Sequence, residues 1–218
     1  MSHEAQFLVF GATGAIGSAC AEKLKSSGLV VHGSRDLREL KGQIDLISSF
    51  DGVVWAQGVN TSDSALNFDI EKLRGLIEAN VAFILQSLSI LLESGKLSQT
   101  SQLVMISSIW SQSSRPNKLS YGISKAAVGG LVRSLAVDLG PMGIHVNSVS
   151  PGPINTPMTI ENLNPAERDR IISESPLKRL ASLEDVSSTV CQLASGKLTG
   201  VTGQEIIVDC GWSVSKLV

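Results

Sequence analysis

The sequence predicts an α/β fold, in which helices cover both faces of a parallel sheet, and three observations support this class. The chain has 218 residues, of which 43% are hydrophobic and 17% charged, with 20 glycines; this balance fits an α/β domain better than a disordered or fibrous chain. The apolar run 7–10 leads into a glycine-rich turn and a helical pattern. A second short apolar run, 103–106, precedes a longer helical pattern that ends at Leu139. Two strand-to-helix units of this kind are typical of a doubly wound parallel sheet.

The length and composition of the chain exclude several classes of protein. A chain of this length suits one well-buried domain, which we expect to span residues 1–218. A formal charge of −2 gives no electrostatic reason to expect a nucleic-acid or membrane-surface partner. The start, MSHEAQ, has no signal-peptide pattern, and no uncharged apolar run reaches membrane-spanning length. Three widely spaced cysteines suggest reduced thiols, and we expect a cytoplasmic protein.

The remaining elements follow from local patterns taken in chain order. After a turn at Gly28, residues 29–32 read as the second strand, and the interval 37–50 has room for one modest helix. Residues 52–56 read as the next strand, and residues 69–92 form a strongly helical stretch, apolar on most sides around Asn80. A helix of this kind lies in a core or an oligomer interface, and its asparagine must be hydrogen-bonded. Further along the chain we expect a helix end at Gly140-Pro141, a strand at 145–149 and a helical segment starting at Pro165.

The glycine-rich turn has the composition of a dinucleotide-binding site. It reads Gly11-Ala12-Thr13-Gly14-Ala15-Ile16-Gly17, between a strand and a helix. Glycines let the backbone approach a pyrophosphate closely, and the helix N-terminus offers free N–H groups and the positive end of a dipole. The alternative interpretation is a tight strand-to-helix turn with no ligand.

Ser108, Tyr121 and Lys125 form a second candidate site. Tyr121 and Lys125 are four residues apart, so they share one face of a helix. Free tyrosine has a pKa of about 10, and an ammonium group about 4 Å away favours the phenolate by roughly 4 kcal/mol, enough to bring that pKa near neutrality. Ser108, at the expected strand end, would hold a substrate oxygen while Tyr121 gives or takes its proton. The alternative is an amphipathic helix with an exposed tyrosine and a solvated lysine.

The spacing of these residues resembles the signature of the short-chain dehydrogenase/reductase family. Ser108 precedes Tyr121-x-x-x-Lys125 by thirteen positions, and other motifs similar to the family's occur in order over nearly the whole chain. The resemblance implies a single-domain Rossmann fold and hydride transfer between a nicotinamide cofactor and a carbonyl or secondary alcohol. It implies that Tyr121 is the general acid/base and that Lys125 lowers its pKa and binds the nicotinamide ribose. Ser108 would polarise the carbonyl, and Asn80 would hold a relay water.

The resemblance also implies a cofactor site and a choice of cofactor. Ser34 and Arg35 follow the second strand, where the family reads the adenosine ribose; Arg35 favours the 2′-phosphate of NADP, while the neighbouring Asp36 is compatible with NAD. A solvated turn is the alternative for this pair. The expected cofactor contacts are Gly11, Thr13, Gly14, Ala15, Ile16, Gly17, Ser34, Arg35, Ala56, Gly58, Tyr121, Lys125, Pro151, Gly152, Ile154 and Thr156.

Three features depart from the pattern of compact family members. The glycine spacing, Gly-x-x-Gly-x-x-Gly, looks like that of extended members such as epimerases and dehydratases. The family's Asn-Asn-Ala-Gly motif reads Trp55-Ala56-Gln57-Gly58. The short interval after Arg35 predicts that the family's third strand is reduced or missing, and both Asp36-Leu37 and Asp45-Leu46 are candidates for contacting adenine.

The expected substrate site lies around Ser108 and the segment that follows it. We expect Ser108, Trp110 and Tyr121 to contact a small carbonyl or alcohol, with Asn60, Gln112 and Arg115 nearby and a lid at about residues 157–178. The tail resembles that of the 3-oxoacyl-acyl-carrier-protein reductases. The lone histidines lack metal-ligand spacing, so no metal site is expected, and the apolar helices predict a homodimer or homotetramer. An epimerase or dehydratase, or a non-catalytic dinucleotide-binding regulator, is the alternative function.

Overall fold

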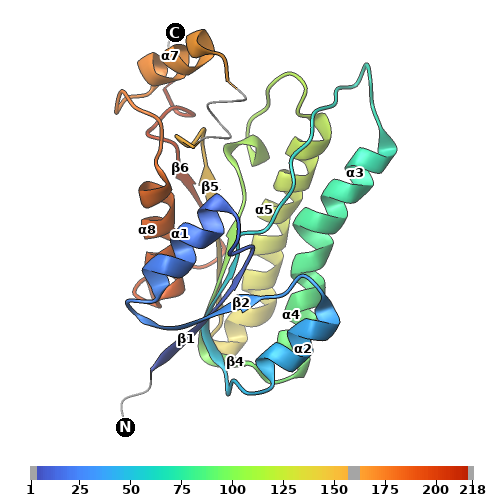
Figure 1. The fold of residues 1–218 in the computed structure, drawn as a ribbon, viewed down its shortest axis with the longest axis vertical. Helices are drawn as coiled ribbons and strands as arrows, with labels where there is room; N and C mark the ends of the chain where they lie inside the picture. Colours follow the sequence, from blue (N-terminus) through green and yellow to red (C-terminus); the bar gives the residue numbers. More distant parts are fainter. Residues whose placement is uncertain (1–3, 157–162, 216–218) are drawn as a thin grey trace.

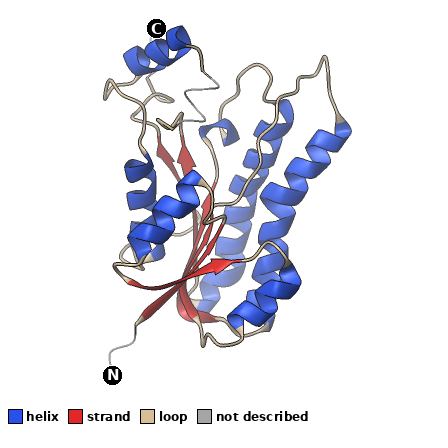
Figure 2. Ribbon diagram, in the orientation of Figure 1, coloured by secondary structure: helices blue, strands red, loops and turns tan. Residues whose placement is uncertain are grey.

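A six-stranded parallel sheet lies between two layers of helices (Figure 1, Figure 2). The computed structural model describes residues 4–156 and 163–215. The strands are β1 (Ala5–Phe10), β2 (Gly28–Gly33), β3 (Phe50–Trp55), β4 (Leu97–Ile106), β5 (His145–Pro151) and β6 (Glu205–Val208). The helices are α1 (Ala15–Leu24), α2 (Leu37–Ile44), α3 (Ile70–Ile77), α4 (Phe83–Glu93), α5 (Leu119–Leu139), α7 (Pro165–Glu174) and α8 (Leu183–Ala194). Short turns η1 (Glu78–Ala82), η2 (Ile109–Ser111) and η3 (Gly140–Met142) complete these elements.

The order of the strands is β2-β1-β3-β4-β5-β6, and every neighbouring pair is parallel. The chain runs outward from β1 to β2, then returns across β1 to β3, so the direction of winding reverses between β1 and β3. This arrangement confirms the doubly wound fold. It also confirms the missing third strand, because only α2 lies between β2 and β3 and β2 therefore forms the edge of the sheet.

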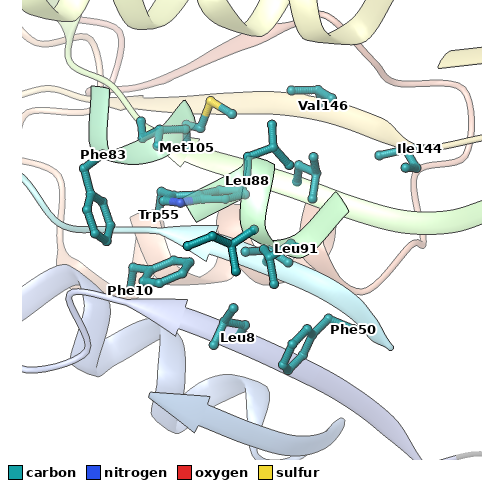
Figure 3. Packing of buried hydrophobic residues seen from close by; sticks show 14 of the residues in the cluster. Leu8, Phe10, Phe50, Trp55, Phe83, Leu88, Leu91, Met105, Ile144 and Val146 are labelled. Atoms are coloured by element: carbon teal, nitrogen blue, oxygen red, sulfur yellow. The ribbon is translucent and has the colours of Figure 1, made fainter. Parts of the chain in front are cut away.

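Each face of the sheet buries its own apolar cluster. On one face α1 and α8 cover the sheet, and Cys20, Leu24 and Val190 pack against strand residues such as Val9 and Val104. On the other face α2, α4 and α5 cover a cluster centred on aromatic side chains (Figure 3). There Phe10 stacks on Trp55 with ring centroids 5.7 Å apart, and Phe83 meets Phe10 edge-on at 5.4 Å. Side chains that alternate along the buried strands thus supply both cores.

The long helical stretch is interrupted at Asn80. Where the sequence predicts one helix over 69–92, α3 and α4 are joined by η1, a π-helical turn. The combined stretch Ile70–Glu93 is, among the described residues, the one helix long and apolar enough to cross a membrane, by length and composition only. Its α4 portion covers the aromatic cluster, and the same properties fit a helix packed against a sheet.

The helix α7 lies beyond the carboxyl ends of β5 and β6 (Figure 1). The sequence places its start at Pro165, and a capping box between Asn164 and Glu167 fixes that start. Trp212 Nε1 donates to Glu174 Oε2 at 2.8 Å, which ties the end of α7 to the C-terminal segment. Residues 157–162 of the expected lid lie outside the described part of the chain.

Candidate active site

The predicted site residues gather beyond the carboxyl ends of the strands. The glycine turn follows β1, Ser34 and Arg35 follow β2, and Ala56 and Gly58 follow β3. Ser108 follows β4, while Pro151 ends β5 and Gly152 comes directly after it. In open α/β sheets ligands bind at this edge, at the point where the winding reverses. Here that point lies between β1 and β3, beside the glycine turn.

The glycine turn has the shape that a dinucleotide pyrophosphate requires. Gly11 adopts a left-handed φ of 74°, and a Cβ at Gly17 would lie 2.1 Å from the Gly11 carbonyl oxygen. The first residue of α1 follows Gly14, whose N-terminal cap position carries no side-chain hydrogen bond. Thr13, Gly14 and Ala15 are exposed at this helix end, where the first N–H groups of α1 have no partner within the helix. These residues fit a nucleotide phosphate bound at a helix N-terminus.

The altered motif after β3 has a structural explanation. Trp55 replaces an asparagine, and its indole Nε1 donates to Ser87 Oγ on α4 at 2.8 Å within the aromatic cluster. Gln57 is 6% exposed, and among the described residues neither its amide oxygen nor its amide nitrogen has a hydrogen-bond partner. Its backbone nitrogen lies 2.5 Å from the position a Cβ on Gly11 would take. An unpartnered buried amide against the glycine turn also fits a polar ligand there.

The structure brings Ser108, Tyr121 and Lys125 together. Ser108 caps η2 at the end of β4, and Tyr121 is in the first turn of α5. Lys125 follows one turn later and is 4% exposed; its Nζ donates to the Ile106 carbonyl oxygen at 3.0 Å. The same Nζ lies 5.8 Å from the centre of the Tyr121 ring. The spacing in the sequence therefore corresponds to one compact group of side chains.

Burial is the main influence on the ionisation of Tyr121 and Lys125. Burial raises the pKa of Tyr121, and a hydrogen bond with Ser108 offsets that only in part. Burial lowers the pKa of Lys125 from 10.5 to about 8. Loss of hydration on burial is the largest effect on the pKa of Tyr121, so the lowering of this pKa by Lys125 stays a prediction. With its pKa raised, Tyr121 is protonated at neutral pH.

Asn80 lies in the π-helical turn and links three elements. Its Oδ1 accepts from the Val59 N–H at 2.9 Å, and its Nδ2 donates to the Val59 carbonyl at 3.1 Å and to Ser124 Oγ at 3.0 Å. The prediction that this buried asparagine is hydrogen-bonded is confirmed. Gly58 is adjacent: a Cβ there would lie 3.1 Å from Asn80 Oδ1 and 3.5 Å from Lys125 Nζ.

Two residues that the sequence did not single out support the start of α5. Asp63 is 1% exposed, and its carboxylate accepts from the Ser120 N–H at 3.0 Å and from the Ser120 hydroxyl. The hydrogen bond from Ser120 lowers the pKa of Asp63, so the carboxylate stays ionised although burial opposes this. Lys118 Nζ lies 5.6 Å from the Tyr121 ring centre and donates to Asn60 Oδ1 at 2.8 Å. These contacts fix the backbone on which Tyr121 lies.

The residues after β2 are arranged around the start of α2. Asp36 caps this helix, because its Oδ1 accepts from the Arg38 N–H at 2.8 Å. The Ser34 hydroxyl donates to Glu39 Oε2 at 2.8 Å, while Arg35 is exposed. The Asp36 carboxylate is therefore occupied in capping α2, and Glu39 is an acidic neighbour of Ser34 that the sequence pattern did not indicate.

The loop after β5 and a pair of tryptophans, Trp110 and Trp212, are also parts of the candidate site. Gly152 N donates to the Val208 carbonyl at 3.0 Å, Ile154 forms a bridge with Ala181, and the Thr156 N–H donates to the Ile154 carbonyl at 2.8 Å. Trp110 meets Trp212 edge-on, with ring centroids 5.9 Å apart. The sequence did not indicate Trp212, which lies about a hundred residues further along the chain from Trp110.

Arg115 and Gln112, the other two residues expected near the substrate, make different contacts. The Arg115 guanidinium lies 6.0 Å from the centre of the Trp110 ring, whereas Gln112 Nε2 donates to Glu205 Oε2 at 3.0 Å. No group of three or more His, Cys, Asp or Glu side chains suited to a metal ion occurs within the described ranges 4–156 and 163–215. His145 contacts Gln102 and the Thr199 carbonyl.

A glycine turn at the switch point of a parallel sheet, together with a Ser–Tyr–Lys group beyond the carboxyl ends of the same strands, is typical of nucleotide-dependent α/β oxidoreductases. Sequence comparison agrees with this class. The family model described as "Enoyl-(Acyl carrier protein) reductase" matches residues 37–213. A 3-oxoacyl-[acyl-carrier-protein] reductase FabG from Rickettsia conorii is 32% identical over 94% of this chain and 95% of its own. An uncharacterized oxidoreductase, YmfI, from Bacillus subtilis is 26% identical over 94% of this chain and 97% of its own.

Solved structures share the fold over almost the whole chain. A short-chain dehydrogenase family protein from Francisella tularensis superposes with a TM-score of 0.85 at 24% identity, covering 97% of this chain and 100% of its own. A gluconate 5-dehydrogenase from Burkholderia cenocepacia, in complex with NADP and tartrate, superposes with a TM-score of 0.84 at 19% identity, covering 96% and 95%.

The chain belongs to the short-chain dehydrogenase/reductase family. It is an oxidoreductase that uses a nicotinamide cofactor for hydride transfer, and the epimerase, dehydratase and regulator alternatives are not favoured.

Proposed function

We propose that this protein is an NADP-preferring carbonyl reductase in which Tyr121 gives its proton to the substrate oxygen. The observation that carries the proposal is the half-buried Tyr121 beside the buried Ser108 and Lys125. The Tyr121 hydroxyl is protonated at neutral pH, which a proton donor in the direction of carbonyl reduction requires. The names of relatives agree with this direction, because several are 3-oxoacyl reductases.

The bound nicotinamide would supply the hydride, and the residues of the chain would orient the reactants and move the proton. Ser108 and Tyr121 would both donate hydrogen bonds to the carbonyl oxygen, which stabilises the charge that develops there. Lys125, one helical turn from Tyr121, would pass the replacement proton toward it. Asn80, which is hydrogen-bonded to Ser124, would hold the relay water. Trp110 would cover the substrate.

The proposed cofactor contacts lie mainly in the segments that follow the carboxyl ends of β1, β2, β3 and β5. The pyrophosphate would lie on the N-terminus of α1, and the adenosine end beside Ser34 and Arg35. The full proposed set is Gly11, Thr13, Gly14, Ala15, Ile16, Gly17, Ser34, Arg35, Ala56, Gly58, Tyr121, Lys125, Pro151, Gly152, Ile154 and Thr156. We also propose a cytoplasmic protein.

Tyr121→Phe tests the catalytic assignment. The phenylalanine keeps the ring and removes the proton donor, so kcat should fall by about 100-fold or more while the fold and cofactor affinity stay intact. The assay follows nicotinamide absorbance with a panel of 3-oxoacyl thioesters and cyclic ketones. Ser89→Ala, which removes an exposed hydroxyl on α4, is the matched control and should retain full activity. A phenylalanine variant with more than roughly a tenth of the wild-type rate would refute the assignment.

Arg35→Ala tests the choice of cofactor. A guanidinium–phosphate contact contributes roughly 1.5–3 kcal/mol, or about 10- to 150-fold in affinity, so wild-type kcat/KM should favour NADPH over NADH by about that factor. The capping role of Asp36 supports this preference, while the contact of Glu39 with Ser34 opposes it. The variant should lose the preference, and Arg74→Ala, an exposed arginine on α3, should keep it. Equal wild-type values for the two cofactors would contradict the proposal.

A further inference from the structure

The carboxylate of Glu205, at the start of β6, joins segments that are far apart in the sequence. Its Oε1 accepts from Ser150 Oγ on β5 at 2.5 Å and from the Ser111 hydroxyl. Its Oε2 accepts from Gln112 Nε2 at 3.0 Å. Ser111 and Gln112 lie 94 and 93 residues before Glu205. One half-buried side chain therefore connects the sheet to the turn that follows β4.

The Glu205 carboxylate fits between β6 and α5 because a glycine of α5 leaves room for it. Gly129 of α5 lies over it, and a Cβ on that glycine would lie 3.1 Å from Glu205 Oε2. Burial raises the pKa of Glu205, but hydrogen bonds from Ser111, Ser150, Gln112 and Ser107 together outweigh burial and hold the pKa below its usual value. The carboxylate is thus ionised at neutral pH, and hydrogen bonds to an ionised acceptor are the strong ones.

The turn held by Glu205 carries the predicted substrate contacts. Ser111 N donates to the Ser108 carbonyl at 2.9 Å, and the Ser111 hydroxyl lies 2.7 Å from the same carbonyl oxygen. Ser111 is thereby shared between Ser108 and Glu205, and its single hydroxyl proton goes to one of them at a time. Trp110 lies between Ser108 and the two residues that Glu205 holds. A change in the position of this turn would shift both Ser108 and Trp110.

We propose that Glu205 is a positioning residue for catalysis: its carboxylate fixes the turn of residues 107–112 and so sets the orientation of Ser108 and Trp110 toward the substrate. This inference rests on the proposed function of Ser108 and Tyr121. Glu205 has no contact with the reacting atoms in this proposal and acts through Ser111 and Gln112. Catalytic groups misplaced by about 1 Å lose up to roughly 100-fold in rate, so support of this kind has a measurable effect.

The first test compares Glu205→Val with Glu205→Gln in the full-length protein. Valine suits a strand and removes all acceptors, whereas glutamine keeps one oxygen for the two serines. We expect Glu205→Val to lower kcat/KM for the carbonyl substrate by about 10-fold or more. Cofactor affinity, measured by fluorescence titration with NADPH, should stay within about 2-fold, and Glu205→Gln should recover most of the lost activity. A purely structural role would instead lower the melting temperature and weaken cofactor binding together.

A double-mutant cycle shows whether Glu205 acts through the turn. Ser111→Ala in the Glu205→Val background should cause no further loss, because the contact has already gone. Ser150→Ala is the matched control, since it removes a donor to Glu205 that lies on the sheet and not on the turn, and its effect should be the smallest. If Glu205→Val does not fold, Ser111→Ala combined with Gln112→Leu removes the donors from the turn and should give the same loss. Additive losses in the cycle would overturn the proposal.

Comparison with Tyr121→Phe separates the two hypotheses. If Tyr121→Phe is inactive and Glu205→Val keeps wild-type kcat/KM, the positioning role is refuted and the proposed function stands. If Tyr121→Phe stays active, the proposed function itself fails.

Discussion

The charge on Lys125 lowers the free energy of unfolding of the protein without bound cofactor. Lys125 is 4% exposed, and within the described part of the chain its ammonium has one acceptor, the Ile106 carbonyl, so hydration lost on burial is not fully replaced. This is why its pKa falls to about 8. A buried lysine that destabilises the fold is a feature of functional sites, where side chains are held for chemistry and not for stability.

Lys125→Met should therefore stabilise the free protein at neutral pH. The pKa of the lysine is 10.5 in the unfolded chain and about 8 in the folded protein, which corresponds to roughly 3 kcal/mol of destabilisation below pH 8. Methionine removes that cost and loses one hydrogen bond of about 1 kcal/mol, so a net gain of about 2 kcal/mol is expected at pH 7. Urea unfolding at pH 7 and pH 9.5 measures it.

The sign of the pH dependence follows from proton binding. Between pH 8 and 10.5 the unfolded wild type binds more protons than the folded state, so wild-type stability rises with pH and the advantage of Lys125→Met shrinks. Lys41→Met, at an exposed position on α2, should show no such trend. A Lys125→Met variant less stable than the wild type at pH 7 would contradict this account.

Sequence patterns located the residues whose spacing is local, and they missed the others. Tyr121 and Lys125 are four apart on one helix, so their shared face follows from helical geometry alone. Asp63 and Glu205 contact the same region from 57 and 94 residues away, and no periodicity links them to it. The pKa of Tyr121 was also out of reach, because it depends on burial that only the packed structure defines.

At the scale of elements, the strand–turn–helix unit of β1 and α1 shows how strictly the chain is constrained around the glycine turn. Gly17 packs against the Gly11 carbonyl, whereas a Cβ at Gly14 would lie 3.4 Å from that carbonyl, an ordinary contact. The glycine turn could be predicted from the sequence because its glycines lie within seven consecutive residues, 11–17. The π-helical turn at Asn80 could not be predicted, because the insertion of a single residue into a helix leaves the apolar pattern on both sides almost unchanged.

Gly17→Ala and Gly14→Ala form a matched pair of substitutions. A methyl group at Gly17 would overlap backbone that cannot move without displacing β1 from α1, and we expect a loss of about 3 kcal/mol or failure to fold. Alanine at Gly14, whose φ of −83° suits any residue, should change the unfolding free energy of the free protein by less than about 1 kcal/mol. Thermal unfolding of both variants without cofactor gives the comparison. Equal stability of the two would show that the turn is not packed as described.

At the scale of the whole molecule, α4 and α5 carry apolar side chains that the protomer itself does not cover. Leu85 on α4 is 44% exposed, and on α5 Ile123 is 44% and Val137 is 75% exposed. The inner faces of these helices pack on the aromatic cluster of the sheet, so their outer faces are left for another partner. Apolar surface on adjacent helices is typical of a protein–protein interface.

We expect a second copy of the chain to cover this surface, giving a homodimer or homotetramer. Symmetric pairing of the same helices is the commonest way to bury such a face. Light scattering at micromolar concentration should give two or four times the 23.0 kDa of the protomer. Leu85→Glu combined with Val137→Asp places charges on the proposed interface and should reduce the mass toward that of the monomer. Leu46→Glu, at a 95% exposed leucine between α2 and β3, should leave the mass unchanged. A wild-type protein that already has the monomer mass would show that these helices do not form the interface.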